Sequence, residues 1–356
     1  KKCYDMMKKW VEYQSSTDRR NYGVRTVDGK EVHEQSDLAT IPYIQVQQCR
    51  GDHLTYDNST PYIYSATAYA AHSADILRRT AYILGKTDDE KRYTELFENI
   101  KRAFNDAWVN DDGSVSYYGE ASSQTAHCGE SVALDGSVTR YTYYAENTPH
   151  CPSQTAYALA VDFDLIPKDK LKNTREYFKN SILRNNGKLT VGFLGISHLA
   201  PALSKVGLDD VAFKLLEQED NPSWLYSVKN GATTIWERWN SYIAETGTFG
   251  DVSMNSFNHY SYGAIGQWFF TDILGIRPVE FGYKSFMLAP KFGGGLTYAK
   301  GSFTSPYGKI SSAWKLHDGK FTYDCTVPTN TTATLKLPNG DIHTLVGGSY
   351  HFEINV

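Results

Sequence analysis

The chain has 356 residues, of which 41% are hydrophobic and 21% are charged, and its formal net charge is −4. This length is sufficient to bury one large core or two domains. Basic and acidic residues are intermixed, which argues against nucleic-acid binding, and no apolar run is long enough to span a membrane.

Helical periodicity dominates the first two-thirds of the chain. Residues 1–14 predict an amphipathic helix, because Tyr4, Met7, Trp10 and Val11 recur at helical spacing. The other expected helices cover residues 62–84, 88–108, 152–163, 168–184, 193–205, 208–219 and 255–274, which gives about eight in all. No signal peptide precedes the first helix, which indicates a chain cut from a longer one, so cytoplasmic, periplasmic and secreted locations all stay open.

Residues 109–151 interrupt the helical pattern with Gly, Ser, Asp, Thr and Tyr. They predict a long loop with one or more hairpins. Such a loop either lines the mouth of a binding site or is an exposed insertion, and both interpretations stay open. The residues to test for ligand contacts are Tyr117, Tyr118, Tyr141, Tyr143 and Tyr144.

The cysteines do not indicate a metal site. They are widely spaced and include no Cys-x-x-Cys pair, which argues against zinc and against a disulfide framework. In an oxidising compartment Cys128 and Cys151 would close a loop within the 109–151 segment. The five positions are Cys3, Cys49, Cys128, Cys151 and Cys325.

Residues 231–240 set one carboxylate, Glu237, between Trp236 and Trp239. The apolar faces of sugar rings stack on aromatic rings, and cleavage of a glycosidic bond requires a positioned carboxylate. The high aromatic content, with 26 Tyr, 16 Phe and 7 Trp, fits such a site, and Trp224 is the further tryptophan to which we assign a role. The alternative is a structural glutamate paired with Arg238 or with a backbone amide.

A second polar cluster follows at residues 253–264, where His259 lies among Asn and Tyr residues. Two polar clusters so close in sequence indicate one convergent pocket. A histidine here is also typical of a packed core or a helix start, but its ring is able to hydrogen-bond sugar hydroxyls or to orient a carboxylate.

After about residue 278 the pattern changes to short alternating stretches separated by Gly, Pro, Asn and Asp turns. About seven strands in fewer than a hundred residues predict a small antiparallel β-sandwich. The clearest strands are expected at residues 284–288, 296–303, 308–315, 320–327, 331–336 and 348–354.

Several ordered, spaced blocks of sequence extend over nearly the whole chain. They are residues 51–52, 67–69, 154–159, 192–195, 222–224, 231–240, 254–263, 282–284, 289–291, 296–299 and 305–308. Together these blocks resemble the bacterial α-L-rhamnosidases of glycoside hydrolase family 78, and a similarity of many ordered blocks is far more specific than one short motif.

The resemblance implies a mainly α plus β fold. Residues 1–277 would form a partial (α/α)6 toroid, incomplete at its N-terminal side, and residues 278–356 a small antiparallel β-sandwich. About eight helices do not complete a twelve-helix ring. Its open side is therefore expected to be covered by a missing N-terminal part of the parent protein or by self-association.

The resemblance also implies a reaction, the inverting hydrolysis of terminal α-L-rhamnosides. The substrate would be a carbohydrate, and the reaction would require no cofactor. Glu237 would be the general base, and His259 would contact substrate or orient the attacking water. Trp224, Trp236 and Trp239 would shape the rhamnose pocket. In the family an aromatic residue follows Gly-Asp in a substrate-contacting loop, where this chain has Asp52 and His53.

The family carries its general acid in an Asp-Cys-Pro-Gln-Arg-Asp-Glu-Arg-like stretch, which this sequence lacks. No other carboxylate stands in a motif that specifies a proton donor, so the chain alone is expected to have little or no activity. The carboxylates considered are Asp52, Asp57, Glu120, Glu130, Asp135 and Glu146. Two alternatives stay open: a helical-toroid hydrolase or lyase for another sugar, and a non-catalytic carbohydrate-binding fragment.

Overall fold

The computed structural model describes residues 2–15, 24–27, 30–33, 42–45, 51–56, 60–116, 128–132, 138–142 and 152–356. The chain divides into two compact units. The first comprises Lys1–Leu208 and Arg238–Ser256, and the second comprises Asp209–Glu237 and Phe257–Val356. Chain segments thus alternate between the units around residue 237, and the domain boundary expected at residue 277 stays a prediction.

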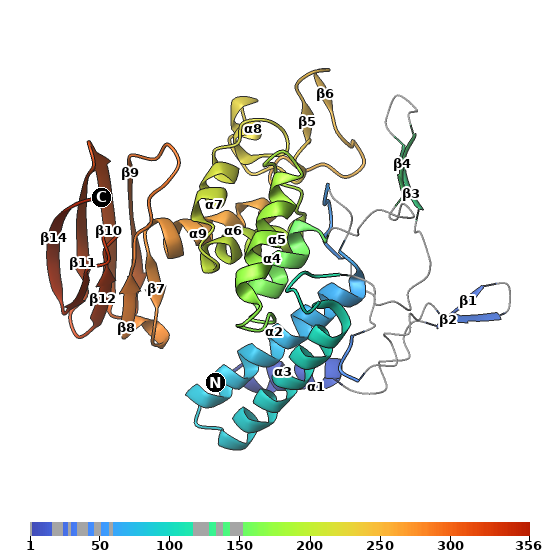
Figure 1. Ribbon diagram of the computed structural model, residues 1–356, viewed down its shortest axis with the longest axis horizontal. Coiled ribbons are helices and arrows are strands. Elements are labelled where there is room, and N and C mark those ends of the chain that lie inside the picture. Colours follow the sequence, from blue (N-terminus) through green and yellow to red (C-terminus); the bar gives the residue numbers. More distant parts are fainter. Residues whose placement is uncertain are drawn as a thin grey trace. The chain divides into compact units, whose positions relative to one another are not determined.

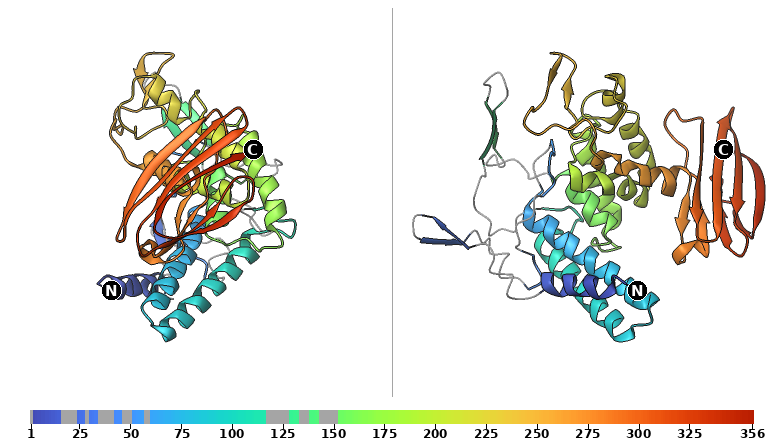
Figure 2. Two further views of the ribbon diagram at one scale, coloured as in Figure 1. Left: turned by 90° about the vertical axis from the view of Figure 1, so that its left-hand side faces the viewer. Right: turned by 180° about the vertical axis from the view of Figure 1, so that it is seen from behind.

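Helices build most of the first unit, close to the ranges expected from the sequence. They are α1 (Tyr4–Ser15), α2 (Tyr62–Ile83), α3 (Thr87–Trp108), α4 (Gln154–Asp162), α5 (Leu171–Leu183) and α6 (Phe193–Lys205). Tyr4 and Val11 of α1 pack on Leu77, Ala81 and Tyr93 in one hydrophobic cluster, in which α1 lies beside α2 and α3 (Figure 2). This cluster accounts for the apolar spacing at the start of the chain.

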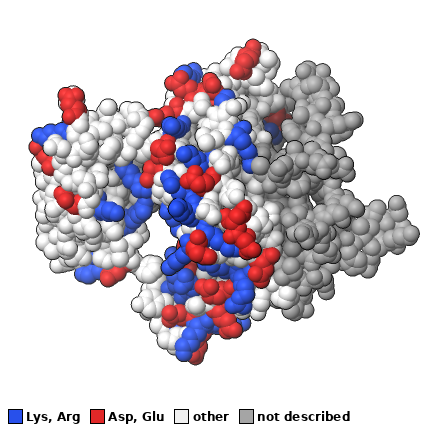
Figure 3. Space-filling view, in the orientation of Figure 1, with Lys and Arg blue, Asp and Glu red and all other residues white. Residues whose placement is uncertain are grey.

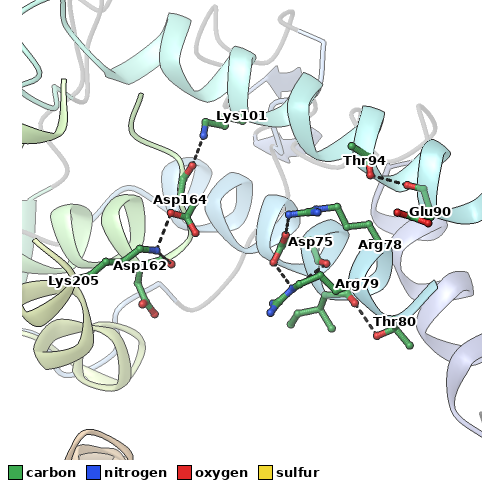
Figure 4. Close-up of polar contacts among 11 residues, drawn as sticks. Asp75, Arg78, Arg79, Thr80, Glu90, Thr94, Lys101, Asp162, Asp164 and Lys205 are labelled. Atoms are coloured by element: carbon green, nitrogen blue, oxygen red, sulfur yellow. Dashed lines mark hydrogen bonds and ion pairs between the residues drawn. The ribbon is translucent and has the colours of Figure 1, made fainter. Parts of the chain in front are cut away.

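Helix α4 is the central helix of the first unit, because residues 154–161 are all buried. Small residues on α2 and α4 allow close approach of neighbouring helices. The turn after α4 is held by two lysines: Lys101 of α3 donates to the carbonyl of Asp164 (2.5 Å), and Lys205 of α6 donates to that of Asp162 (2.9 Å) (Figure 4). On the outer face of α2, Arg79 forms an ion pair with Asp75 at 2.8 Å.

Three short hairpins also occur in the described residues. The first pairs β1 (Val24–Val27) with β2 (Lys30–His33), the second pairs β3 (Cys128–Val132) with β4 (Val138–Thr142), and the third pairs β5 (Tyr242–Ile243) with β6 (Thr248–Phe249). The second lies in the segment for which the sequence predicts a hairpin. Cys49 and Cys151 fall outside the described residues, so the pairing of Cys128 with Cys151 stays a prediction.

The helical part of the second unit comprises α7 (Asp209–Leu216), α8 (Trp224–Lys229) and a composite helix. The composite helix starts as 3₁₀ at η3 (Ser261–Ala264), continues as α9 (Ile265–Trp268) and ends as the π-helical η4 (Phe269–Ile273). The expected helix at 255–274 therefore begins six residues late. The reason is that residues 255–259 are hydrogen-bonded to residues 234–241 instead of to each other, as described below.

The strands of the second unit form two four-stranded sheets (Figure 1). The first sheet has the order β14-β11-β10-β9, from β9 (Tyr298–Ser305), β10 (Gly308–His317), β11 (Lys320–Val327) and β14 (Gly348–Asn355). The second has the order β13-β12-β8-β7, from β7 (Ile276–Pro278), β8 (Ser285–Leu288), β12 (Thr332–Lys336) and β13 (Ile342–Leu345).

The sequence missed one feature of this sandwich. Strand β12 pairs with β8 in parallel, because the chain passes through three strands of the other sheet before it returns, so the second sheet is mixed rather than antiparallel. Two hydrogen bonds join the sandwich to the end of the composite helix: Trp314 Nε1 donates to the carbonyl of Ile273 (2.8 Å), and Ser312 Oγ donates to that of Leu274 (2.7 Å). The fold class, helices followed by a small β-sandwich, is confirmed.

None of the helices in the described ranges is both long and apolar enough to cross a bilayer. In the view of Figure 3, basic and acidic side chains are interspersed over the helical surface. A continuous basic stripe of the kind that binds a nucleic-acid backbone is not present on this face.

Candidate active site

The segment with the sequence Trp236-Glu237-Arg238-Trp239 has no regular secondary structure, and both its tryptophans are buried. Trp236 is 6% exposed and packs edge-on against Phe257, with ring centroids 5.2 Å apart. Trp239 is 2% exposed, and its indole Nε1 donates to the carbonyl of Val191 at 3.0 Å. Glu237 between them is half-buried. Each indole therefore anchors the backbone within its own unit: Trp236 just before the carboxylate in the second unit, and Trp239 just after it in the first.

Arg238 is held by the loop that follows it. Its Nε donates to the carbonyl of Met254, and its guanidinium forms an ion pair with Asp251, both at 2.8 Å. The hydroxyl and backbone N–H of Ser253 also donate to Asp251, and these bonds together with Arg238 lower the pKa of that carboxyl. The structure thus shows an ion pair for Arg238 within residues 238–256.

The second polar cluster lies beside the first. The backbone N–H of His259 donates to the carbonyl of Ile235 at 2.8 Å, and the hydroxyl of Thr234 donates to the carbonyl of Phe257. Residues 257–259 therefore run alongside residues 234–235, immediately before Glu237. The two segments are thus neighbours in space, and the convergent pocket expected from their proximity in sequence stays a prediction.

The ring of His259 is half-buried and oriented by its neighbours. Its Nδ1 accepts a hydrogen bond from the backbone N–H of Ser261 at 3.3 Å. An accepting Nδ1 places the proton of the neutral ring on Nε2. The ring also stacks on Tyr260, with an interplanar angle of 8°. His259 is thus set up to donate from Nε2.

Trp224 belongs to the same region of the second unit. It is the first residue of α8, whose N-terminus is capped by the Ser223 hydroxyl through the N–H of Tyr226 at 3.0 Å. Its half-buried indole donates from Nε1 to the carbonyl of Tyr262 at 2.9 Å, just after His259. Trp224, Trp236, Glu237 and His259 are therefore linked through short segments of one unit.

Asp52 and His53 lie in the first unit, where Asp52 caps helix α6. Asp52 is 4% exposed, and its two oxygens accept hydrogen bonds from the backbone N–H groups of Gly192, Leu194 and Gly195 at 2.8–2.9 Å and from the hydroxyl of Thr155. Burial raises the pKa of this carboxyl, and the four hydrogen bonds oppose that rise. Sequence reasoning missed this capping role.

His53 is half-buried and packs edge-on against Phe193, with ring centroids 5.5 Å apart. Its carbonyl accepts from the N–H of Phe193 at 3.0 Å. The contacts with substrate expected of Asp52, His53 and the three tryptophans stay predictions.

The other carboxylates considered as acids give no further candidate. Asp57, Glu120, Asp135 and Glu146 lie outside the described residues, and Glu130 lies in β3, where the side chain is not described. In the parts of the chain that the structure describes, no group of three or more His, Cys, Asp or Glu side chains is arranged to hold a metal ion.

Comparison with known families gives two matches that together span nearly the whole chain. Residues 1–273 match the bacterial alpha-L-rhamnosidase 6 hairpin glycosidase domain, and residues 275–352 match the bacterial alpha-L-rhamnosidase C-terminal domain.

Curated relatives named alpha-L-rhamnosidase are similar over most of the chain. One from Formosa agariphila is 33% identical over 96% of this chain, and one from Streptomyces avermitilis is 38% identical over 81%. The chain spans only 32% and 24% of the length of these two relatives.

Solved structures of alpha-L-rhamnosidases are also similar to this chain over nearly its whole length. The alpha-L-rhamnosidase of Streptomyces avermitilis complexed with L-rhamnose superposes with a TM-score of 0.79 at 30% identity, covering 99% of this chain and 30% of that chain. The native enzyme from Aspergillus terreus gives 0.74 at 28% identity, covering 99% of this chain and 36% of that chain.

Proposed function

Because this chain belongs to the bacterial α-L-rhamnosidase family, we propose that it supplies the general-base half of a site that hydrolyses terminal α-L-rhamnosides with inversion. Glu237 is the base. The observation that supports this assignment is the hydrogen bond from the backbone N–H of His259 to the carbonyl of Ile235. This bond holds His259 beside the segment that leads into Glu237.

In the proposed reaction the Glu237 carboxylate takes a proton from a water molecule. The water oxygen attacks the anomeric carbon from the face opposite the leaving group and forms the new C–O bond as the glycosidic C–O bond breaks. The leaving oxygen takes a proton from a general acid, so the products are a free alcohol and L-rhamnose of inverted anomeric configuration. The base and acid of such sites stand roughly 6.5–9.5 Å apart to admit the water.

The surroundings of Glu237 suit this task. The buried Trp236 packs on Phe257 within the second unit and fixes the backbone next to Glu237, so the carboxylate is positioned without being fully buried. A half-buried carboxylate keeps the access to water that a base must have. His259, with its proton on Nε2, either donates to a sugar hydroxyl or orients the attacking water.

The general acid is proposed to come from a longer protein of which this chain is part. The supporting facts are the absence of the family's acid motif from this sequence and the share of about a quarter to a third of the relatives' length that the chain spans. The isolated chain is accordingly proposed to hydrolyse rhamnosides poorly or not at all. The open side expected of a partial toroid would be covered by the rest of that protein or by a second copy.

Replacing Glu237 by Gln in the longer protein tests the assignment. The E237Q variant keeps the size of the side chain but not its basicity, so turnover of an aryl α-L-rhamnoside should fall about 100- to 10,000-fold while L-rhamnose binding persists. Glu245, an exposed glutamate in the following loop, provides the matched control, and E245Q should retain full turnover. Full turnover in E237Q would overturn the assignment.

A further inference from the structure

A buried carboxylate and a buried indole meet at one peptide group of the first unit. Asp52 Oδ2 accepts from the N–H of Gly192 at 2.8 Å. The indole of Trp239 donates to the carbonyl oxygen of Val191 at 3.0 Å. The Val191 carbonyl and the Gly192 N–H are the two ends of the same peptide group, which is planar and rigid. Whatever fixes one end of this group therefore fixes the other.

Several further bonds hold this peptide segment to the loop that contains Asp52. Tyr56 N–H and the Thr55 hydroxyl both donate to the carbonyl of Thr190, at 2.8 and 2.6 Å. The N–H of Phe193 donates to the carbonyl of His53 at 3.0 Å. Residues 190–193 are thus hydrogen-bonded to the loop at Thr190, Gly192 and Phe193, while the Val191 carbonyl accepts from Trp239.

The close approach of the two segments requires glycine at position 192. A Cβ built there would lie 2.1 Å from the carbonyl oxygen of His53, which no side chain tolerates. The contact between the two segments therefore depends on the absence of a side chain at position 192.

The charge of Asp52 acts on Trp239 through this peptide. A carboxylate that accepts from an N–H polarises the peptide group and increases the negative charge on its carbonyl oxygen, which strengthens the bond that this oxygen accepts. Trp239 lies two residues after Glu237. The charge on Asp52 and the backbone that follows Glu237 are thus coupled through one peptide unit.

We propose that Asp52 is a positioning residue for the segment that directly follows Glu237 in the chain, acting through the Val191–Gly192 peptide and the indole of Trp239. Its catalytic consequence rests on the proposed function, in which Glu237 is the base. The coupling itself, from Asp52 to Trp239, is a property of the first unit and is testable without any reaction.

The test is made on the 356-residue chain by following its tryptophan indole N–H signals by NMR. The chain has seven tryptophans, and the Trp239 signal is identified by its loss in Trp239→Phe. Asp52→Asn replaces one carboxylate oxygen by an amide NH2 and removes the negative charge. The Val191 carbonyl is then less polarised. The Trp239 signal should move, and its indole proton should exchange with solvent about tenfold faster.

Two controls separate this coupling from general loosening. The indole of Trp314 donates to Ile273 in the second unit and should keep its signal in Asp52→Asn. Thr174→Val removes a different buried hydrogen bond of the first unit, from Thr174 to the carbonyl of Gly113 (2.7 Å), and should leave Trp239 unchanged. An unchanged Trp239 signal and exchange rate in Asp52→Asn would overturn the proposal, as would an equal change in Thr174→Val.

A second variant decides the question if Asp52→Asn does not fold. Thr155→Val keeps the carboxylate and removes only one of its four donors, and the two side chains are nearly equal in size. A smaller shift of the Trp239 signal, without a shift of Trp314, is expected, and no shift would overturn the proposal.

Turnover in the longer protein then separates this inference from the proposed function. Asp52→Asn should lower kcat more than it raises KM, because it disturbs the base rather than the substrate contacts. A moved Trp239 signal together with full turnover in E237Q would refute Glu237 as the base but leave the coupling standing. Collapse of turnover in E237Q with an unmoved Trp239 signal would refute the coupling alone.

Discussion

Asp52 and Trp239, which are 187 positions apart in the sequence, bind opposite ends of the peptide group between Val191 and Gly192, at 2.8 and 3.0 Å. Neither residue needs to touch a substrate to influence the site. The arrangement ties a buried charge to the backbone beside Glu237, and it gives the Gly-Asp motif a physical role in this chain.

Gly192→Ala should destabilise the first unit. The added methyl group overlaps the carbonyl of His53, so the loop and helix α6 must separate, at a cost of about 1–3 kcal/mol in the free energy of unfolding. Urea unfolding measures the change. Gly266→Ala is the control, because that helical position has open space and alanine favours helix, so stability should stay equal or rise. Equal effects of the two substitutions would contradict the tight contact.

Asp251→Asn should remove a pH-dependent contribution to stability. The pKa of Asp251 is lowered in the folded chain, first by the Ser253 hydroxyl and also by Arg238, so the folded state binds its proton less readily than the unfolded state. The stabilisation is therefore present above the unfolded pKa near 4 and is lost as pH falls through the lower folded pKa. The carboxylate is partly exposed, so the effect should stay below about 1 kcal/mol.

Thermal unfolding of the wild-type chain and Asp251→Asn at a series of pH values measures this contribution. The two curves should differ at pH 7 and converge at acidic pH. A difference that grows as the pH is lowered would show the opposite sign and contradict the assignment.

Native thiol reactivity should distinguish the cysteines. Cys325 is buried in β11, and burial, with a smaller effect of Asp324, raises its thiol pKa to about 12, so little thiolate forms at neutral pH. Cys3 is exposed. Brief maleimide labelling followed by peptide mass spectrometry should find Cys3 modified and Cys325 modified only after unfolding. The same map without reductant shows whether Cys128 and Cys151 pair.

His259→Ala should lower kcat/KM of the longer protein for an aryl α-L-rhamnoside by about 100-fold or more, since a positioned donor near the reacting atoms is lost. The backbone bond to Ile235 does not need the ring and should persist. Tyr260→Phe is the matched control: its side chain is 86% exposed and stacks on His259, and loss of the hydroxyl should leave kcat/KM within about twofold. Equal losses in both variants would refute a specific role for His259.

The sequence predicted helices best where periodicity acts alone. Helix α6 was expected at 193–205 and occupies Phe193–Lys205. The helix expected at 255–274 begins only at Ser261, because the side chain of Asn255 donates to the carbonyl of Ser241 and His259 bonds back to Ile235. Long-range bonds to loops competed with helix formation there, and a local pattern contains no information on them.

The segments of the candidate site stand out in the sequence, but the bonds between them do not. Glu237, His259 and Trp224 stand out by residue type, and the structure links their segments. The capping of α6 by Asp52 was not predictable, since its backbone donors lie about 140 residues away and belong to no side chain. The glycines at 192 and 195 were the available signal, because they permit the close approach that the cap requires.

The most direct test of Glu237 as the general base is rescue of a truncated variant by a small anion in the longer protein. Glu237→Ala removes the base, and azide, which attacks the anomeric carbon without losing a proton, should restore cleavage of an activated aryl α-L-rhamnoside. The expected product is β-L-rhamnosyl azide, of inverted configuration. Undiminished hydrolysis by Glu237→Ala without azide, or a rhamnosyl azide of retained configuration, would contradict the account.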